Sequence, residues 1–223
     1  MVSKSIEEVA YHEIINMIIQ HQYPPGSAVV ESQVAEHLKM SRTPVRSALK
    51  RLVSDGLLES TLNKGCFVPN LSRKDLDNLF QFRYLLEPQC AADAAQKYSS
   101  IYQKKIDLLL KNESECITSG TGQLHLINEK MHTLIVEISE NNYYLHSVKQ
   151  VTWRCQLYLF FFDNFYMNSA ITKGNLASEK FQSPTQHAAL FQAIAENDTT
   201  LAFKIMQEHV SSTYELLTTN KWR

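Results

Sequence analysis

Three histidines and one asparagine have the spacing expected of ligands carried on separate helices. Asn128 and His132 are four residues apart, which places both side chains on one face of a helix. His187 and His209 each fall on the apolar stripe of a later predicted helix. Inward-facing histidines from three helices can converge inside a bundle, which is how bundles hold metals or ligands. The alternative for each histidine is a core or surface residue that one hydrogen bond satisfies.

Two arginines and a tyrosine are candidates for binding an anionic ligand. Arg83 is predicted to share a helical face with apolar residues, so its guanidinium could clamp a carboxylate through two hydrogen bonds. The alternative is an ion pair with Glu87, one helical turn further along. Arg154 interrupts an aromatic-rich helix, and Tyr158 on the same segment offers a hydroxyl. These residues predict a site for a small organic acid.

A second group of residues suits nucleic acid. Between His37 and Ser54 the chain has no acidic residue and five cationic ones, namely Lys39, Arg42, Arg46, Lys50 and Arg51. A helix fits the major groove of DNA, and arginine can bridge the O6 and N7 atoms of guanine. A solvated cationic helix face is the alternative.

Residues at the ends of this segment suit the DNA backbone. Ser41 and Thr43 lie at a predicted helix N-terminus, where hydroxyl and N–H groups bind phosphate oxygens. Lys64, beside Gly65 in a predicted turn, could reach a flanking phosphate or the minor groove.

The composition is that of a globular chain with one large domain or two modest ones. The 223 residues are 44% hydrophobic and carry a formal net charge of −1, so the positive charge is local. The four cysteines are scattered without a CxxC pair, and the N-terminus lacks a signal-peptide pattern, so we expect a cytoplasmic protein. The longest apolar run, residues 157–162, is far shorter than the roughly 20 residues that span a bilayer, so no membrane is expected.

The first 70 residues are predicted to form three helices and a β-hairpin. Hydrophobic periodicity predicts helices over residues 5–22 and 31–40, with Pro24-Pro25-Gly26 ending the first. Ser41 is the predicted N-cap of a third helix that ends at Asp55. Short strands are predicted at 57–59 and 66–69, across a turn at 63–65, after an extended piece at 27–30. The third helix carries the cationic segment, and the hairpin is a candidate wing.

Beyond Asn70 the pattern is helical throughout, with almost no strand signal. Helices are predicted over residues 72–98, 101–117, 124–140, 143–165, 184–196 and 199–217, and a loop over 167–182. The sequence therefore predicts a mainly α protein, with an all-α bundle of six or seven helices after a boundary near residues 70–73.

The N-terminal region resembles the winged helix of the bacterial GntR family in PPGSAVVESQVAEHLKMSRTPVRSALKRLVSDGLL, followed by NKGCFV. The resemblance covers residues 5–70 and implies that residues 1–70 form a winged helix-turn-helix DNA-binding domain. It implies a homodimer that binds double-stranded operator DNA at a short inverted repeat. The DNA contacts that it implies, with Lys50 added from the charge pattern, are Ser41, Arg42, Thr43, Arg46, Lys50, Lys64 and Gly65.

The C-terminal region resembles the FCD domain of the FadR branch in FQFRYLLEPQCAADAA, NEKMH and QHAALFQAIAENDTTLAFKIMQEHV. The resemblance implies that residues 71–223 form an all-helical FCD ligand-binding and dimerisation domain. It also implies a divalent metal on one carboxylate and three histidines, which carry over to Asn128, His132, His187 and His209. Asparagine in place of aspartate removes a negative charge and lowers metal affinity, while imidazoles favour zinc or nickel over magnesium.

Together these features predict a sequence-specific DNA-binding transcription regulator, not an enzyme, whose operator affinity depends on a small carboxylate effector bound with a divalent metal. One alternative is a metal-dependent hydrolase that uses the three histidines, although the chain lacks an HExxH helix and no acidic residue is expected beside them as a general base. The other alternative is a regulator whose sensor domain has lost its ligand and serves only for dimerisation. Asn128 supports keeping this alternative, because asparagine stands there in place of aspartate.

Overall fold

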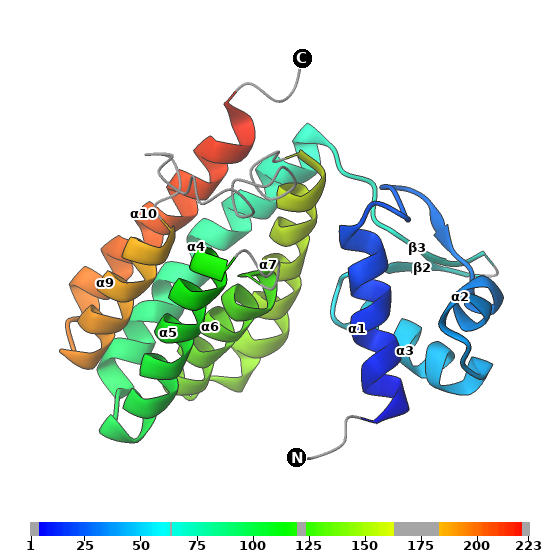
Figure 1. The fold of residues 1–223 in the computed structure, drawn as a ribbon. Coiled ribbons are helices and arrows are strands. Elements are labelled where there is room, and N and C mark those ends of the chain that lie inside the picture. The colour runs from blue at the N-terminus through cyan, green and yellow to red at the C-terminus, as the bar shows by residue number, and fades with distance from the viewer. Residues whose placement is uncertain (1–4, 63, 120–123, 163–182, 220–223) are drawn as a thin grey trace. The chain divides into compact units, whose positions relative to one another are not determined.

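The chain folds into two compact units, Met1–Ser72 and Arg73–Arg223. A computed structural model describes residues 5–62, 64–119, 124–162 and 183–219 (Figure 1). The described residues are mostly α-helical with one small antiparallel sheet, which confirms the mainly α prediction.

Three helices form the body of the first unit: α1 (Ile6–Ile19), α2 (Glu31–Leu38) and α3 (Arg42–Ser54). Ser5 caps α1, since its hydroxyl accepts a hydrogen bond from the amide of Glu8 at 3.1 Å. On α3 the apolar residues Val45, Leu49 and Leu52 recur at helical spacing, and all three are buried in the structure. Burial of this stripe turns the opposite side of α3 toward solvent.

A three-stranded antiparallel sheet follows, with β3 (Gly65–Phe67) between β1 (Ala28–Val29) and β2 (Glu59–Thr61). Ala28 is paired with Phe67, and Thr61 is paired with Gly65. The extended piece predicted at 27–30 is thus the third strand of the wing sheet. Gly65 has a φ of +90°, which only glycine adopts readily.

The strand predicted at 57–59 is wrong by two residues, since β2 begins at Glu59. Leu57 and Leu58 are buried, and the amides of both donate hydrogen bonds to the carbonyl of Leu52, at 2.9 and 3.2 Å. These bonds terminate α3 and use the amides that a strand would need. The predicted turn residue Asn63 lies outside the described residues.

The second unit is helical throughout its described part. Its described elements are α4 (Arg73–Lys97), η1 (Ser100–Tyr102), α5 (Gln103–Ser119), α6 (Leu124–Ser139), α7 (Asn142–Phe162), α9 (Ser183–Ala195) and α10 (Thr199–Thr218). Helix α4 lies against α6, α7, α9 and α10, with α5 covering α6 and α9 (Figure 1). The six described α-helices agree with the six or seven predicted, while the predicted loop over 167–182 and the end of the helix predicted over 143–165 lie outside the described residues.

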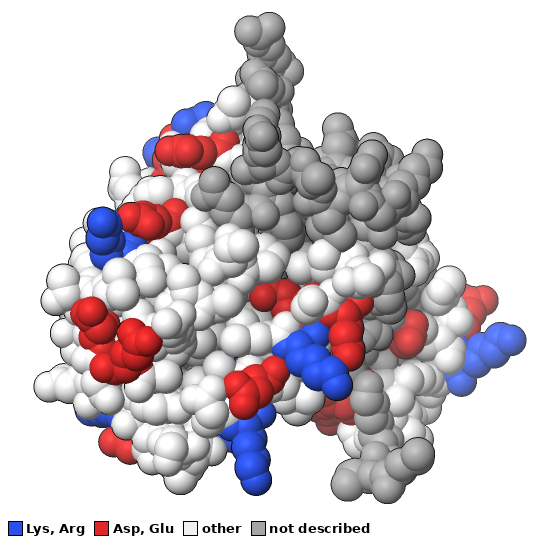
Figure 2. Space-filling view, turned by 60° about the vertical axis from the view of Figure 1, so that its left-hand side comes forward, with Lys and Arg blue, Asp and Glu red and all other residues white. Residues whose placement is uncertain are grey.

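Charged side chains of both signs are scattered among uncharged residues on the face shown in Figure 2, in keeping with the net charge of −1. None of the described helices is long and apolar enough to cross a membrane. The largest fully buried side chains of the helical core are Trp153, Tyr158, Phe80 and Phe191.

Candidate nucleic-acid interface and candidate metal centre

The N-terminal half of α3 exposes every residue that was predicted there as a DNA contact. Ser41 is the N-cap residue, as predicted, but its side chain makes no capping hydrogen bond, so its hydroxyl is not used by the helix. The exposed residues of this surface are Ser41, Arg42, Thr43, Arg46 and Lys50. Lys64 and Gly65 are also exposed, in the wing.

Arg46 is held by a carboxylate that the sequence analysis did not single out. Its Nε donates a hydrogen bond to Oε2 of Glu31 at 2.8 Å, and its Nη2 donates one to Oε1 at 2.9 Å. The hydrogen bonds and charge of Arg46 lower the pKa of Glu31. The two residues are 15 positions apart on different helices, so helical spacing gave no sign of the pair.

A pocket of about 380 Å³ lies between α3 and the wing. Its walls carry Glu31, Arg46, Lys50 and Lys64, and its floor includes apolar residues such as Leu49. The recognition candidates on α3 and the cationic wing residue therefore border one hollow. The tertiary structure brings them together although Lys50 and Lys64 belong to separate elements.

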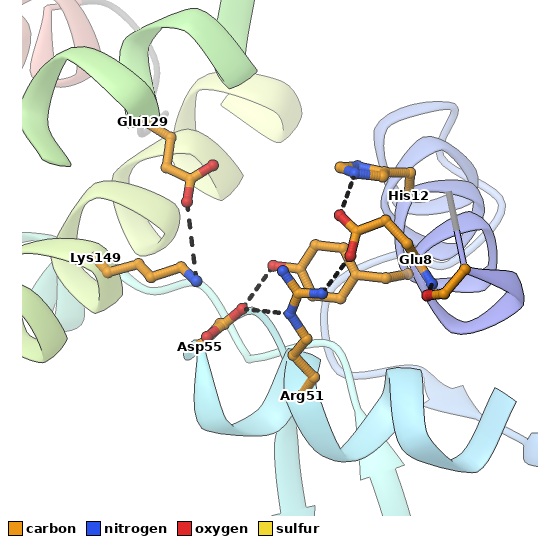
Figure 3. A network of polar contacts seen from close by, with 8 residues as sticks. Glu8, His12, Arg51, Asp55, Glu129 and Lys149 are labelled. Atoms are coloured by element: carbon orange, nitrogen blue, oxygen red, sulfur yellow. Dashed lines mark hydrogen bonds and ion pairs between the residues drawn. The ribbon is translucent and has the colours of Figure 1, made fainter. Parts of the chain in front are cut away.

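Arg51, the last cation of the basic segment, faces away from this surface. Figure 3 shows it beside Glu8 of α1, to whose Oε2 its Nη1 donates a hydrogen bond at 2.6 Å. The guanidinium also lies 4.1 Å from the ring centroid of Tyr11, whose hydroxyl donates to Asp55 at 2.7 Å. Burial would lower the pKa of Arg51, but Glu8 outweighs burial and raises it. Arg51 therefore ties α1 to α3.

The three predicted histidines meet inside the second unit. His132 on α6, His187 on α9 and His209 on α10 are all buried, and one ring nitrogen of each lies within 4.8 Å of those of the other two. Small ring rotations would bring these nitrogens to the spacing of ligands on one ion, since Zn–N bonds are about 2.0–2.1 Å. The convergence that the sequence predicted is present.

Each of these imidazoles has a polar partner at Nδ1, a feature typical of metal-bound histidines. For His132 the contact is close, but it does not meet the directional requirement of a hydrogen bond. The Nδ1 contacts are His132 with Glu87 at 2.8 Å, His187 with Glu113 at 2.7 Å, and His209 with Gln186 at 3.1 Å.

The Nε2 atoms of His132 and His187 are buried and have no hydrogen-bond partner among the described residues. Such unsatisfied polar atoms are costly in a protein interior unless a ligand engages them. Burial lowers the pKa of His132, and burial together with the other two histidines lowers the pKa of His209 further. Neutral imidazoles are the form that binds metals, so this donor set fits a zinc-like or nickel-like ion.

Arg83 forms the ion pair with Glu87, which was the alternative to a ligand clamp. Its Nε and Nη2 contact the carboxylate of Glu87 at 2.5 and 3.2 Å, and its Nη1 lies 3.0 Å from Sγ of Cys155. Burial alone would lower the pKa of Arg83 and raise that of Glu87, but their mutual attraction reverses both shifts. Since Glu87 also contacts His132, Arg83 reaches the histidines through Glu87.

Two carboxylates that the sequence did not reveal lie beside the histidines. Glu87 on α4 and Glu113 on α5 both contact them, and both are buried. They come from helices on which no histidine lies, so local spacing could not reveal them. Both are engaged with imidazole Nδ1 atoms, which is a role in orienting a ligand rather than in activating water.

Asn128 lies on α6 one turn before His132, as expected, and is half-buried. Its place in the ligand set stays a prediction.

Arg154 and Tyr158 come together at a different place. Both contact Oδ2 of Asp75, at 3.0 Å from Nε of Arg154 and 2.6 Å from the hydroxyl of Tyr158. Asp75 is twelve residues before Glu87 on α4, which corresponds to about 18 Å along a helix. The structure therefore gathers these two residues around a carboxylate of the chain itself.

Comparison with known families agrees with both units. Residues 6–68 match the family described as bacterial regulatory proteins, gntR family, and residues 78–212 match the FCD domain. The chain belongs to the GntR family. The resemblances noted in the sequence are thereby confirmed, and the wing and α3 of this GntR-family chain are its winged helix-turn-helix.

Individual relatives point the same way. The Nta operon transcriptional regulator of Aminobacter aminovorans is 30% identical over 62% of this chain and 66% of its own length. The uncharacterized HTH-type regulator YdhC of Bacillus subtilis is 29% identical over 63% of this chain and 64% of its own length, so both matches span slightly less than two thirds of the relative. The structure of E. coli McbR/YncC shares the fold, with a TM-score of 0.72 at 22% identity over 96% of this chain and 99% of that one. These relatives are regulators rather than enzymes, as predicted.

Proposed function

We propose that this chain is a transcription regulator that contacts operator DNA through α3 and the wing. The observation that carries the proposal is the exposure of cationic and hydroxyl side chains on the N-terminal half of α3, with Lys64 across a shared pocket. A helix of this kind fits the major groove, and a wing lysine reaches the adjacent backbone. The proposed contacts are Ser41, Arg42, Thr43, Arg46, Lys50, Lys64 and Gly65.

Replacing Arg46 with alanine should weaken binding to a preferred duplex by about tenfold to a hundredfold and relax base preference, since a bidentate base contact is lost. Replacing Lys64 with alanine should weaken binding to all duplexes alike and reduce the salt dependence by about one phosphate contact. Gel-shift titration at several salt concentrations measures both effects. If both variants bind like the parent, this surface does not contact DNA.

We also propose that the helical unit holds a divalent metal on His132, His187 and His209, with Asn128 as a neutral fourth donor. The buried Nε2 atoms of His132 and His187, which have no hydrogen-bond partner in the described part of the chain, and the polar contacts at each Nδ1 support this site. A bound ion would supply a positive charge that attracts a ligand carboxylate. The protein's own part is to orient the three imidazoles and, through burial, to favour the neutral forms of His132 and His209.

A small organic acid is the effector class that this site favours. A hundredfold change in operator affinity requires about 2.7 kcal/mol of coupling between effector and DNA. A thermal-shift screen of carboxylic acids with and without zinc tests the proposal. If no acid stabilises the chain under either condition, a helical unit that serves only for dimerisation is the better description.

The contacts made by the nearest carboxylates disfavour the hydrolase alternative. The two carboxylates nearest the histidines are Glu87 and Glu113, and both are occupied by imidazole Nδ1 atoms. A general base must reach a water on the open side of the metal, whereas these two carboxylates contact the opposite side of the imidazole rings.

We propose further that the chain acts as a homodimer through the exposed face of α4. Leu85 is 78% exposed and Phe82 is 45% exposed, three residues apart on this helix. Large exposed apolar side chains are typical of protein contacts. Between positions 78 and 89 the other exposed residues of this face are neutral and polar, namely Asn78, Gln81 and Gln89, and the exposed charge of Lys74 lies one turn before Asn78.

Replacing Leu85 with glutamate should shift the chain from dimer to monomer at micromolar concentration, because a charge would be buried at the centre of the interface. Sedimentation equilibrium measures the change. The matched control is Ile101→Glu, since Ile101 is 75% exposed on η1, away from this face. A Leu85→Glu variant that dimerises as tightly as the parent would place the interface elsewhere.

A further inference from the structure

Glu31 lies where DNA is proposed to bind, although a carboxylate there repels phosphates. It is the first residue of α2, and it borders the pocket that also carries Arg46, Lys50 and Lys64. The N-terminal end of a helix stabilises a negative charge, so Glu31 has a reason to remain ionised. Its carboxylate accepts two hydrogen bonds from Arg46.

The geometry of the pair leaves part of the guanidinium available. Glu31 takes the Nε–H and one N–H of Nη2, which together form the side edge of the group. A guanidinium has about five N–H donors in a fixed plane, so the two donors of Nη1 and the second donor of Nη2 stay available. One from each nitrogen forms the end edge, which can bridge the O6 and N7 atoms of guanine. Arg46 can therefore retain both hydrogen bonds to Glu31 while its end edge contacts a base.

Without this carboxylate Arg46 would be poorly ordered. Its side chain is 60% exposed, and a long exposed arginine samples many rotamers that must be restricted when it binds. Most exposed ion pairs are weak, but two-point arginine–carboxylate contacts are the exception because their geometry is defined.

The same contact changes how Arg46 responds to phosphates. The carboxylate offsets the positive charge that attracts any duplex, while the directional N–H donors of the end edge remain for a base. Both consequences raise the preference for one sequence over others.

We propose that Glu31 is a positioning residue that aims Arg46 at a base edge and weakens attachment to non-cognate DNA. This inference rests on the proposed DNA-binding function. It makes Glu31 a determinant of specificity although Glu31 itself need not touch DNA.

The experiment compares two duplexes, one selected from a random library by the full-length parent and one with the same bases in scrambled order. For Glu31→Gln we expect the ratio of the two affinities to fall at least about tenfold, while affinity for the scrambled duplex stays equal or rises. A ratio equal to that of the parent overturns the inference. Affinities that fall by the same factor for both duplexes also overturn it, because they mark a purely structural role.

Two controls sharpen the result. Glu36→Gln removes the same charge from an exposed position on the same helix and should leave the ratio unchanged. In an Arg46→Ala background, Glu31→Gln should no longer change the ratio, since the residue that it positions is absent. If the parent enriches no duplex sequence, the proposed function fails instead, which separates that failure from failure of the Glu31 inference.

Discussion

Replacing Arg83 with methionine is expected to lower the free energy of unfolding by about 3 to 5 kcal/mol, the usual cost of removing one partner of a buried ion pair. Glu87 would be left buried beside a largely neutral His132. Urea denaturation followed by tryptophan fluorescence measures the loss, because Trp153 is buried on α7 of the helical unit.

The loss should also depend on pH with a defined sign. In the parent, burial would raise the pKa of Glu87, but Arg83 and His132 outweigh burial and lower it, so the pair stabilises the fold above about pH 4.3. Without Arg83, burial dominates and the pKa of Glu87 rises. The folded carboxyl then stays protonated where the unfolded one ionises, so stability falls as pH rises. The deficit of the variant should therefore grow between about pH 5 and pH 7.

A matched control lies on the same helix. Arg73 pairs with Asp77 at the same four-residue spacing, but both side chains are exposed, so Arg73→Met should change stability little. The double variant Arg83→Met/Glu87→Gln should recover part of the loss, since no buried charge remains unpaired. If Arg83→Met costs no more than Arg73→Met, the buried pair does not stabilise the helical unit.

Replacing His187 with alanine is expected to lower zinc affinity by at least about a hundredfold. Changes to residues that only orient a metal ligand typically cost about 10- to 100-fold, and loss of a ligand should cost more. Glu113→Gln, which alters only the Nδ1 partner of His187, should give the smaller effect. Asn128→Asp should raise affinity by adding a negative donor. Competition with a chromophoric chelator measures all three.

His146 provides the control for this series, because it is an exposed histidine on α7 outside the cluster. His146→Ala should bind zinc like the parent. Equal zinc affinity in His187→Ala and the parent would remove His187 from the site. Unchanged affinity in Asn128→Asp would remove position 128 from the ligand set and leave the three histidines.

Much of this protein follows from local sequence alone. Burial of Val45, Leu49 and Leu52 is encoded by their helical spacing, which in turn exposes the cationic side of α3. The histidines are likewise predictable as inward-facing residues, because each lies on an apolar stripe. The misplaced start of β2 shows the limit of this approach, since Leu57 and Leu58 are as apolar as strand residues but complete the end of α3.

The order of the elements, the inward face of each helix and the identity of the residues on that face are therefore encoded locally. The partner of a polar side chain depends instead on the packed fold. Arg154 and Tyr158 contact Asp75, and Arg46 contacts Glu31, in each case from a different helix. For Arg83 the local spacing offered the pair with Glu87, and the packed fold selected it over a free guanidinium. Helical periodicity relates residues within a turn or two, whereas pairing across helices depends on how the packed faces meet.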